Sequence, residues 1–189
     1  MSEAQLQSHF VSNSVAETIL VGAYLGEALR AGDCVAIRGR LGAGKTVIVQ
    51  GILQGLGIHS FQGSPTFVLV HPYRLPELDT ELLHIDAYRL GPQATEQWLQ
   101  LGWEEWLAGD KIVVVEWADY VAGILPEDRL ELNIAIPTET NTNGGNAANG
   151  EQESMSIAGS DTRKMALNAL GVRSVQLLQA LKERLQAAK

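Results

Sequence analysis

The sequence predicts an α/β fold in which a mostly parallel central sheet is flanked by helices and joined by a C-terminal antiparallel hairpin. Short apolar runs typical of buried strands alternate with stretches of helical periodicity along most of the chain. A glycine-rich segment, Gly39–Thr46, joins a strand-like run to a helical one. Near the end, the alternating pattern of Arg129–Ile136 is followed by a second strand-like run, Arg163–Ala169, and this pair predicts the hairpin.

The N-terminal segment predicts a strand, a helix and a second strand. His9–Val11 is expected to form the first, short strand. Ser14 and Glu17 have the S-x-x-E spacing of a capping box, which predicts a helix that ends near Gly32. The apolar run Cys34–Ile37 then predicts a buried strand directly before the glycine-rich segment.

Gly39–Thr46 fits the pattern G-x-x-x-x-G-K-[ST], the phosphate-binding P-loop of NTPases. Glycines let successive backbone N–H groups turn inward around a phosphate, and Lys45 can reach the β- and γ-phosphates. The Thr46 hydroxyl can ligate Mg²⁺, and the helix predicted over Val47–Leu53 adds its unpaired N–H groups. Strand, loop and helix follow in the required order, so the sequence predicts a nucleotide-binding protein.

Strands and helices are predicted downstream of this loop as well. A turn at residues 63–65 leads into a strand over residues 66–70. Glu81–Asp86 and Lys111–Trp117 predict two more strands, and the second is apolar throughout, as expected for a central strand covered on both faces. Pro92–Leu107 predicts one or two helices between them.

Aromatic and aliphatic residues in the last two helical regions are expected to serve packing. The tryptophans Trp98, Trp103 and Trp106 are interpreted as packing residues, not as a platform for stacking bases. The final helix presents one apolar face, formed by Val175, Leu178, Leu181 and Leu185.

Composition restricts the class of protein. The 189 residues, 46% of them hydrophobic, predict one domain over residues 1–189, with the low-complexity stretch 137–161 as a loop insertion inside it. The net charge of −8 argues against a broad basic surface for nucleic acid and favours protein partners. No transmembrane helix or secretion signal is expected, and the single cysteine, Cys34, favours a cytoplasmic location.

A P-loop needs an acidic partner, and two residues compete for this role. Asp86 and Glu116 each end an apolar strand, so both can face the phosphates from the carboxyl edge of the sheet. His84 is interpreted as an ordinary, partly buried histidine and not as a zinc ligand. Candidates for neutralising charge on a transferred phosphoryl group are Arg38, Arg40, Arg89 and Arg163.

The absence of guanine-reading and switch motifs bears on which nucleotide is bound. The sequence contains no N-K-x-D and no D-x-x-G, so a Ras-like GTPase is disfavoured and ATP is the expected ligand.

With these motifs in place, the chain resembles the bacterial TsaE (YjeE) family, the ATPases of threonylcarbamoyladenosine biosynthesis. The resemblance runs from about Ser14 to Leu170 and rests on four motifs in the same order and spacing. They are Gly39–Thr46 (G-x-LGAGKT in the family), Ser64–Phe67 (SPT-[FY]), Asp86–Leu90 (D-x-YRL) and Val115–Trp117 (VEW).

The resemblance implies a P-loop ATPase that acts with the proteins TsaB and TsaD. Together they would install N6-threonylcarbamoyl on the adenosine 3′ of the anticodon in tRNAs that read A-starting codons. This subunit would hydrolyse ATP, slowly without its partners, whereas TsaD would transfer the group. It would meet tRNA mainly through the complex, and no membrane is implied.

By position, the resemblance also implies roles for individual residues. Thr46 and Glu116 would hold Mg²⁺, Asp86 would support hydrolysis and Thr66 would lie in a switch segment. Lys45, Thr66 and Asp86 form the expected catalytic set. The residues expected to bind ATP are Gly39, Gly42, Ala43, Gly44, Lys45, Thr46, Val47, Trp117 and Arg163.

The chain departs from the family pattern at two positions of the loop region and in one insertion. Members commonly carry an acid where this chain has Arg40, and a second threonine where it has Val47. The insertion at 137–161 lengthens a hairpin that the family keeps short, and this bears on the reach of Arg163.

Two other classes of function remain as alternatives. A small-molecule kinase on the same fold usually carries an arginine-bearing lid, and residues 92–109 contain no arginine. A non-hydrolysing adaptor that uses ATP as a clamp is disfavoured by the intact Lys45, Thr46, Asp86 and Glu116.

Overall fold

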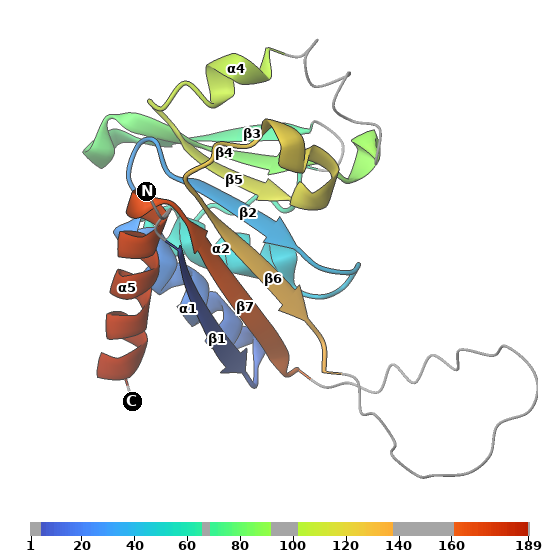
Figure 1. The fold of residues 1–189 in the computed structure, drawn as a ribbon, viewed down its shortest axis with the longest axis vertical. Helices are drawn as coiled ribbons and strands as arrows, with labels where there is room; N and C mark the ends of the chain where they lie inside the picture. The colour runs from blue at the N-terminus through green and yellow to red at the C-terminus, as the bar shows by residue number, and fades with distance from the viewer. Residues whose placement is uncertain (1–4, 66–68, 92–101, 138–160, 189) are drawn as a thin grey trace, which may run out of the picture.

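One seven-stranded sheet organises the described part of the chain (Figure 1). The computed structural model describes residues 5–65, 69–91, 102–137 and 161–188. The strand order across the sheet is β1-β7-β6-β2-β5-β4-β3. The strands are β1 (Gln5–Ser12), β2 (Cys34–Arg38), β3 (Val70–Leu75), β4 (Thr80–Asp86), β5 (Ile112–Glu116), β6 (Arg129–Ala135) and β7 (Arg163–Leu170).

The centre of the sheet is parallel and its two sides are antiparallel. Strand β2 pairs in parallel with β5 and β6, and β4 pairs in parallel with β5. On one side β7 runs antiparallel between β6 and β1, and on the other β3 runs antiparallel to β4. The predicted α/β class, with its parallel centre and C-terminal hairpin β6–β7, is confirmed. The β3–β4 hairpin was not predicted.

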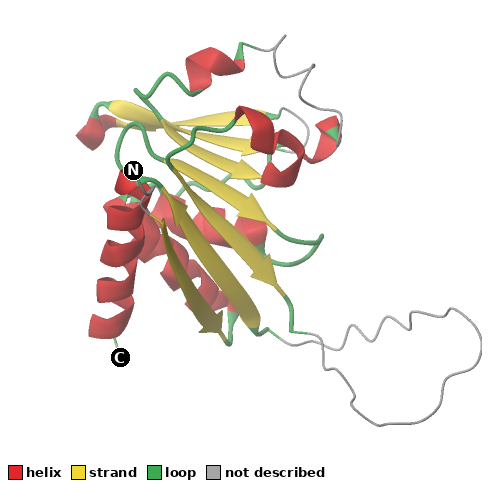
Figure 2. Ribbon diagram, in the orientation of Figure 1, coloured by secondary structure: helices red, strands yellow, loops and turns green. Residues whose placement is uncertain are grey.

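Helices cover the two faces of the sheet unequally (Figure 2). One face packs against the long helices α1 (Val15–Ala28), α2 (Lys45–Gly55) and α5 (Val172–Ala187). The other face packs against the short helix α4 (Trp103–Trp106) and the 3₁₀ segment η3 (Ala118–Ile124). Two further 3₁₀ turns, η1 (Pro76–Leu78) and η2 (Tyr88–Leu90), flank β4.

Successive side chains of a central strand point to opposite faces of the sheet, so each strand contributes residues to both cores. In β2, Val35 and Ile37 belong to the core under the long helices, whereas Cys34 and Ala36 belong to the core on the other face. Every residue from Cys34 to Ile37 is buried. This explains why the strand reads as a continuous apolar run.

Helix α2 is held against α1 by close contact between their backbones. A Cβ atom added to Gly22 would lie 2.5 Å from the carbonyl oxygen of Ile48, and one added to Gly51 would lie 2.2 Å from that of Ile19. Glycine at both positions therefore lets the two helices approach closely. This contact fixes α2, whose N-terminus carries the P-loop.

Several predicted boundaries differ from the structure. The first helix ends at Ala28, because the backbone at Leu29 is already extended, and not near Gly32. The strand expected over residues 66–70 instead runs over Val70–Leu75, and residues 66–68 lie outside the described residues. Proline within this strand concealed it, but β3 is the edge strand, where a missing N–H is tolerated.

Two other predicted regions lie partly outside the described residues. Of the helical region 92–107, residues 92–101 are not described, and Trp98 is among them. Of the low-complexity stretch 137–161, residues 138–160 are not described, so its assignment as a loop insertion stays a prediction. In the part of the chain that is described, no helix is long and apolar enough to cross a membrane.

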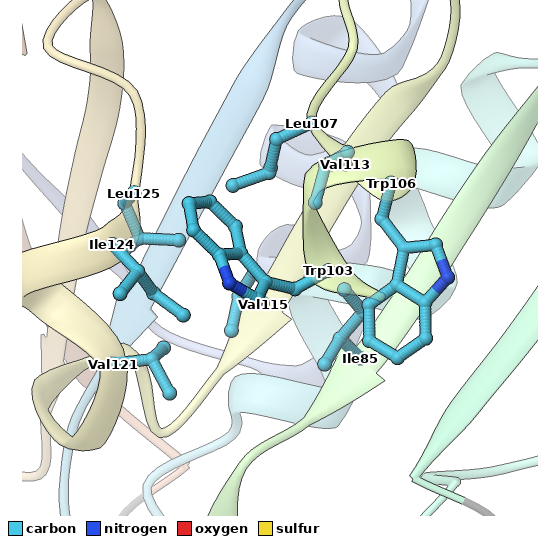
Figure 3. A pocket seen from close by; sticks show the side chains of 9 residues that line it. All are labelled: Ile85, Trp103, Trp106, Leu107, Val113, Val115, Val121, Ile124 and Leu125. Carbon is cyan, nitrogen blue, oxygen red and sulfur yellow. The ribbon is translucent and has the colours of Figure 1, made fainter. Parts of the chain in front are cut away.

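The tryptophans that are described do pack in a core (Figure 3). The ring of Trp103 lies between Trp106 and the η3 region, near Ile124 and Leu125. The apolar pocket beneath these rings holds only about 10 Å³, room for one water at most. This pocket is a packing defect and not a ligand site.

Helix α5 is capped by a side chain from a distant loop. Its N-cap residue, Gly171, has no side chain, and the carboxylate of Asp128 accepts the backbone N–H groups of Arg173 and Ser174, both at 2.8 Å. Burial works to raise the pKa of Asp128. The backbone hydrogen bonds from Arg173 and Ser174, the Ser174 side chain and the charge of Arg173 together outweigh burial and hold that pKa below its usual value.

Asp128→Ala is therefore expected to lower the free energy of unfolding by about 1–2 kcal/mol at pH 7, as loss of a helix cap does. Because the pKa of Asp128 is lower in the folded state, this stabilisation is fully present above pH 3.8 and is lost as the pH falls below it. Urea unfolding of wild type and variant from pH 7 to pH 3 measures the difference. A difference that persists in acid would contradict the assignment.

The single cysteine is expected to be chemically inert in the folded protein. Cys34 is buried in β2, and burial raises the pKa of its thiol to about 12. Because the thiolate is the reactive form, the folded chain should not react with a thiol reagent such as DTNB during a time in which the unfolded chain reacts completely. Reaction of one thiol equivalent in guanidinium chloride, and none before it, checks this prediction.

Candidate active site

The glycine-rich segment forms a loop between β2 and α2 that only glycine can build. Gly39, Gly42 and Gly44 have φ angles of 146°, 76° and 106°, in the region that disfavours other residues. A Cβ atom on Gly39 would also lie 2.3 Å from the carbonyl oxygen of Ile134 in β6. Gly44 is the N-cap of α2, so the helix N-terminus opens directly onto the loop. Such a terminus attracts anions.

The side chain of Lys45 lies within this loop. Its ammonium donates hydrogen bonds to the carbonyl oxygens of Gly39 at 2.8 Å and of Arg40 at 3.0 Å. It also lies 3.7 Å from the ring centroid of Trp117, a cation–π distance. Arg40 itself is exposed. The cation is thus held between the loop backbone and the ring of Trp117.

The charge environment of Lys45 has two opposing parts. Burial lowers the pKa of Lys45, and the nearby carboxylates of Glu116 and Asp86 raise it in part. Both carboxylates come from the ends of neighbouring parallel strands, where β4 and β5 pair Asp86 with Glu116. The sheet therefore brings the two predicted acidic residues together beside the loop lysine.

Glu116 contacts the threonine of the P-loop. The Thr46 hydroxyl donates a hydrogen bond to Oε2 of Glu116 at 2.9 Å, although 70 positions separate the two residues. Its other oxygen, Oε1, lies 2.8 Å from Nε2 of His84. The interpretation of His84 as an ordinary, partly buried histidine was wrong, because the ring is fully buried and bonded to an acidic residue of the site.

Asp86 has different hydrogen-bond donors from Glu116. The hydroxyl of Ser64 donates a hydrogen bond to its Oδ2, and the backbone N–H of Tyr88 donates to its Oδ1 at 3.0 Å. Its backbone N–H donates to the carbonyl oxygen of Leu69 at 3.0 Å. Asp86 is thereby tied to the segment between α2 and β3. Thr66, the predicted switch residue of this segment, lies outside the described residues.

Trp117 takes an unusual backbone conformation at the end of β5. Its φ angle is 57°, in the left-handed region. The ring lies 4.7 Å from that of Tyr88 and 5.9 Å from that of Tyr120, both measured between centroids. The ammonium of Lys45 lies over the ring of Trp117. Trp117 therefore lies beside the P-loop.

Arg163 reaches the P-loop from the hairpin strand β7. Its Nε donates a hydrogen bond to the carbonyl oxygen of Ala43 at 2.8 Å. A Cβ atom on Gly44 would lie 3.6 Å from the same nitrogen. Arg163 therefore contacts the P-loop backbone directly. Val47 lies half-buried in the first turn of α2, next to Thr46.

Arg38, another arginine candidate, is engaged in ion pairs. It forms one with Glu131 at 3.0 Å and a second with Asp119 at 3.1 Å. Those carboxylates neutralise its charge, which weakens its case as a neutraliser of phosphate. Arg89 lies exposed in η2, three residues beyond Asp86 at the end of β4.

Sequence reasoning missed two polar residues of the site, Ser64 and His84. One signal for His84 was available. Residues two apart in a strand face the same side, so His84 and Asp86 had to share a face of β4. Ser64 was part of the motif Ser64–Phe67, but it was given no role in the site, because a turn fixes no direction for its side chains.

A mixed sheet with a parallel centre, a glycine loop between β2 and α2, and acidic residues at the ends of β4 and β5 define a P-loop NTPase-like fold. The family model described as "Threonylcarbamoyl adenosine biosynthesis protein TsaE" matches residues 12–143. The chain belongs to the TsaE family.

Individual relatives agree with this assignment. The chain is similar to the tRNA threonylcarbamoyladenosine biosynthesis protein TsaE of Treponema pallidum, with 36% identity over 69% of this chain and 93% of that protein. It is 31% identical to the Bacillus subtilis protein of the same name, over 79% of this chain and 78% of that one. The crystal structure of Bacillus subtilis YdiB superposes with a TM-score of 0.70, at 26% identity, over 97% of this chain and 99% of that chain.

Proposed function

We propose that this chain is an ATP-binding and ATP-hydrolysing subunit that is required to form threonylcarbamoyladenosine in tRNA, 3′ of the anticodon in tRNAs that read A-starting codons. It acts with TsaB and TsaD and does not itself transfer the threonylcarbamoyl group. The names of its relatives support the assignment to this pathway. The observation that carries the ATP-binding part is the hydrogen bond between Thr46 and Glu116.

The residues present fit ATP with Mg²⁺. Mg²⁺ prefers hard oxygen ligands, and the Thr46 hydroxyl and Glu116 Oε2 offer two such oxygens within 2.9 Å of each other. The ammonium of Lys45 and the amides of the glycine loop offer positive charge and donors for the phosphates. When bound, the ion would neutralise charge on the β- and γ-phosphates. In this assignment, Thr46 and Glu116 hold the metal and Lys45 holds the phosphates.

Asp86 is the residue that we assign to hydrolysis. It lies beside Glu116 in the register of β4 and β5, and its carboxylate accepts hydrogen bonds from Ser64 and from the backbone of Tyr88. Such a carboxylate can accept a proton from a water molecule at the γ-phosphate side. Ser64 orients this carboxylate, and Thr66 is proposed to join it from the same segment. Arg163 and Trp117 are proposed to contact the nucleotide.

The proposed partners are proteins first and tRNA second. A net charge of −8 does not favour independent binding of a polyanion. The complex with TsaB and TsaD would therefore supply most of the contacts to tRNA. The lone buried cysteine supports a reducing compartment, and we propose the cytoplasm.

A pull-down with purified TsaB and TsaD, with ATP and Mg²⁺ or with EDTA, tests the proposal. We expect association that depends on ATP and Mg²⁺, and ATP turnover that rises when the partners are added. Association without any dependence on nucleotide, or none at all, would contradict the proposal and favour a small-molecule kinase. Phosphate release measured for this chain alone gives the basal rate for comparison.

A further inference from the structure

His84 is a polar side chain in an apolar layer of the protein. It lies in the middle of β4, opposite Val114 in the register with β5, and its exposed fraction is 0%. The ring of Phe61 stacks on it with 6.4 Å between centroids. The helix-facing core around it includes Leu82 and Val114. An apolar residue would fill this position without the cost of removing a polar ring from water.

Only one of the two ring nitrogens of His84 has a partner among the residues that the structure describes. Nε2 lies 2.8 Å from Oε1 of Glu116, and the tautomer that carries its proton on Nε2 donates this bond. Nδ1 is buried and has no hydrogen-bond partner within the same described ranges. A buried polar atom without a partner costs stability. The gain from this histidine must therefore lie in the bond to Glu116.

Because of that bond, the two carboxylate oxygens of Glu116 have different partners. Oε1 accepts from His84, which leaves Oε2 to accept from Thr46 at 2.9 Å. The backbone of β5 fixes the Cα position of Glu116. It does not fix the rotation of the carboxylate, which lies at the end of a long side chain. The ring of His84 is held by a rigid strand and by Phe61, so it can fix that rotation.

We propose that His84 is a positioning residue for Glu116: it holds Oε1 so that Oε2 faces Thr46 and the site of Mg²⁺. This inference rests on the proposed function, because it assigns a role at the same site. His84 does not touch nucleotide or metal, and it acts through Glu116. Residues that orient metal-ligating groups in this way typically change metal affinity by about 10–100-fold when they are lost.

The test compares His84→Met with His84→Gln in the full-length chain. Methionine fills the space without a donor, whereas the glutamine amide nitrogen can take the position of Nε2 and donate to Glu116. The measurement is the fluorescence of an N-methylanthraniloyl derivative of ATP, titrated with MgCl₂ and, separately, in EDTA. His84→Met is expected to raise the Mg²⁺ concentration at half-saturation by about 10–100-fold.

The affinity in EDTA and the Mg²⁺ requirement of His84→Gln distinguish a positioning role of His84 from a merely structural one. Affinity in EDTA is expected to stay within about twofold for both variants, and His84→Gln is expected to keep the Mg²⁺ requirement of wild type within about threefold, since it restores the donor. Equal Mg²⁺ requirements for the methionine variant and wild type would overturn the inference. So would an equal loss in both variants, or a loss that is as large in EDTA.

Two additions make the result independent of folding and of the proposed function. If His84→Met does not fold, His84→Asn replaces it, because its shorter amide does not reach Glu116. If wild type binds the ATP derivative and the variants have the same Mg²⁺ requirement as wild type, the result contradicts only the role of His84. Wild type that binds no nucleotide contradicts the proposed function itself and the inference with it.

Discussion

Lys45→Ala is expected to weaken ATP binding by about 100-fold or more. The ammonium lies in the P-loop, where it now contacts two loop carbonyls and the ring of Trp117. With ATP bound, it would instead make charge-assisted hydrogen bonds to phosphate oxygens, each of which contributes about 1.5–3 kcal/mol. Every 1.4 kcal/mol is a factor of about ten in affinity, so two such bonds give the expected loss. Isothermal titration calorimetry with ATP and Mg²⁺ measures it.

A matched control for this variant is Lys182→Ala. Lys182 lies in α5, which packs on α1 and on strands β1, β6 and β7, and its loss removes the same charge from the chain. ATP affinity is expected to be unchanged, within about twofold. If the ATP affinity of Lys45→Ala is also unchanged, the assignment of the P-loop as the ATP site is wrong. Circular dichroism spectra that match wild type show that the two variants are folded.

The parts of the fold that the sequence predicted are those that depend on neighbouring residues. The strand Cys34–Ile37, the glycine loop and α2 follow one another along the chain, so their local pattern was sufficient. The same holds for the capping box, in which Ser14 accepts the N–H of Glu17 at 3.1 Å. Even there, the Glu17 carboxylate bonds the N–H of Asn13 at 2.7 Å, one residue before the expected partner.

The parts that were missed depend on which segments become neighbours in space. His84 bonds Glu116 from 32 positions away, and this contact exists only because β4 and β5 pair in parallel. Asp128 caps α5 from 45 positions away, and no local pattern marks it. Both candidate acids could therefore be named from the sequence, but their different hydrogen-bond partners could not.

The structure separates the surroundings of the two carboxylates, and their variants are expected to differ accordingly. Glu116 contacts Thr46, the other proposed ligand of Mg²⁺, whereas Asp86 contacts Ser64 and the backbone of Tyr88. Glu116→Gln is therefore expected to raise the Mg²⁺ concentration needed for ATP binding by at least about tenfold, because loss of a direct ligand should cost no less than loss of a residue that orients one. Asp86→Asn is expected to change this requirement by less than about threefold, since the ligands of the metal remain.

The two amide variants are matched, because each keeps the shape of its side chain and removes only the negative charge. In Glu116→Gln the new amide oxygen can still accept a hydrogen bond from His84, so the variant should fold. Asp86→Asn should slow ATP hydrolysis by about 100-fold or more, the range typical of a positioned acid or base. ATP and Mg²⁺ should still bind to this variant. Titration of MgCl₂ and phosphate release measured on both variants provide the comparison. If Asp86→Asn proves the more dependent on Mg²⁺, the assigned roles of the two carboxylates must be exchanged, because the metal would then lie nearer to β4 than to Thr46.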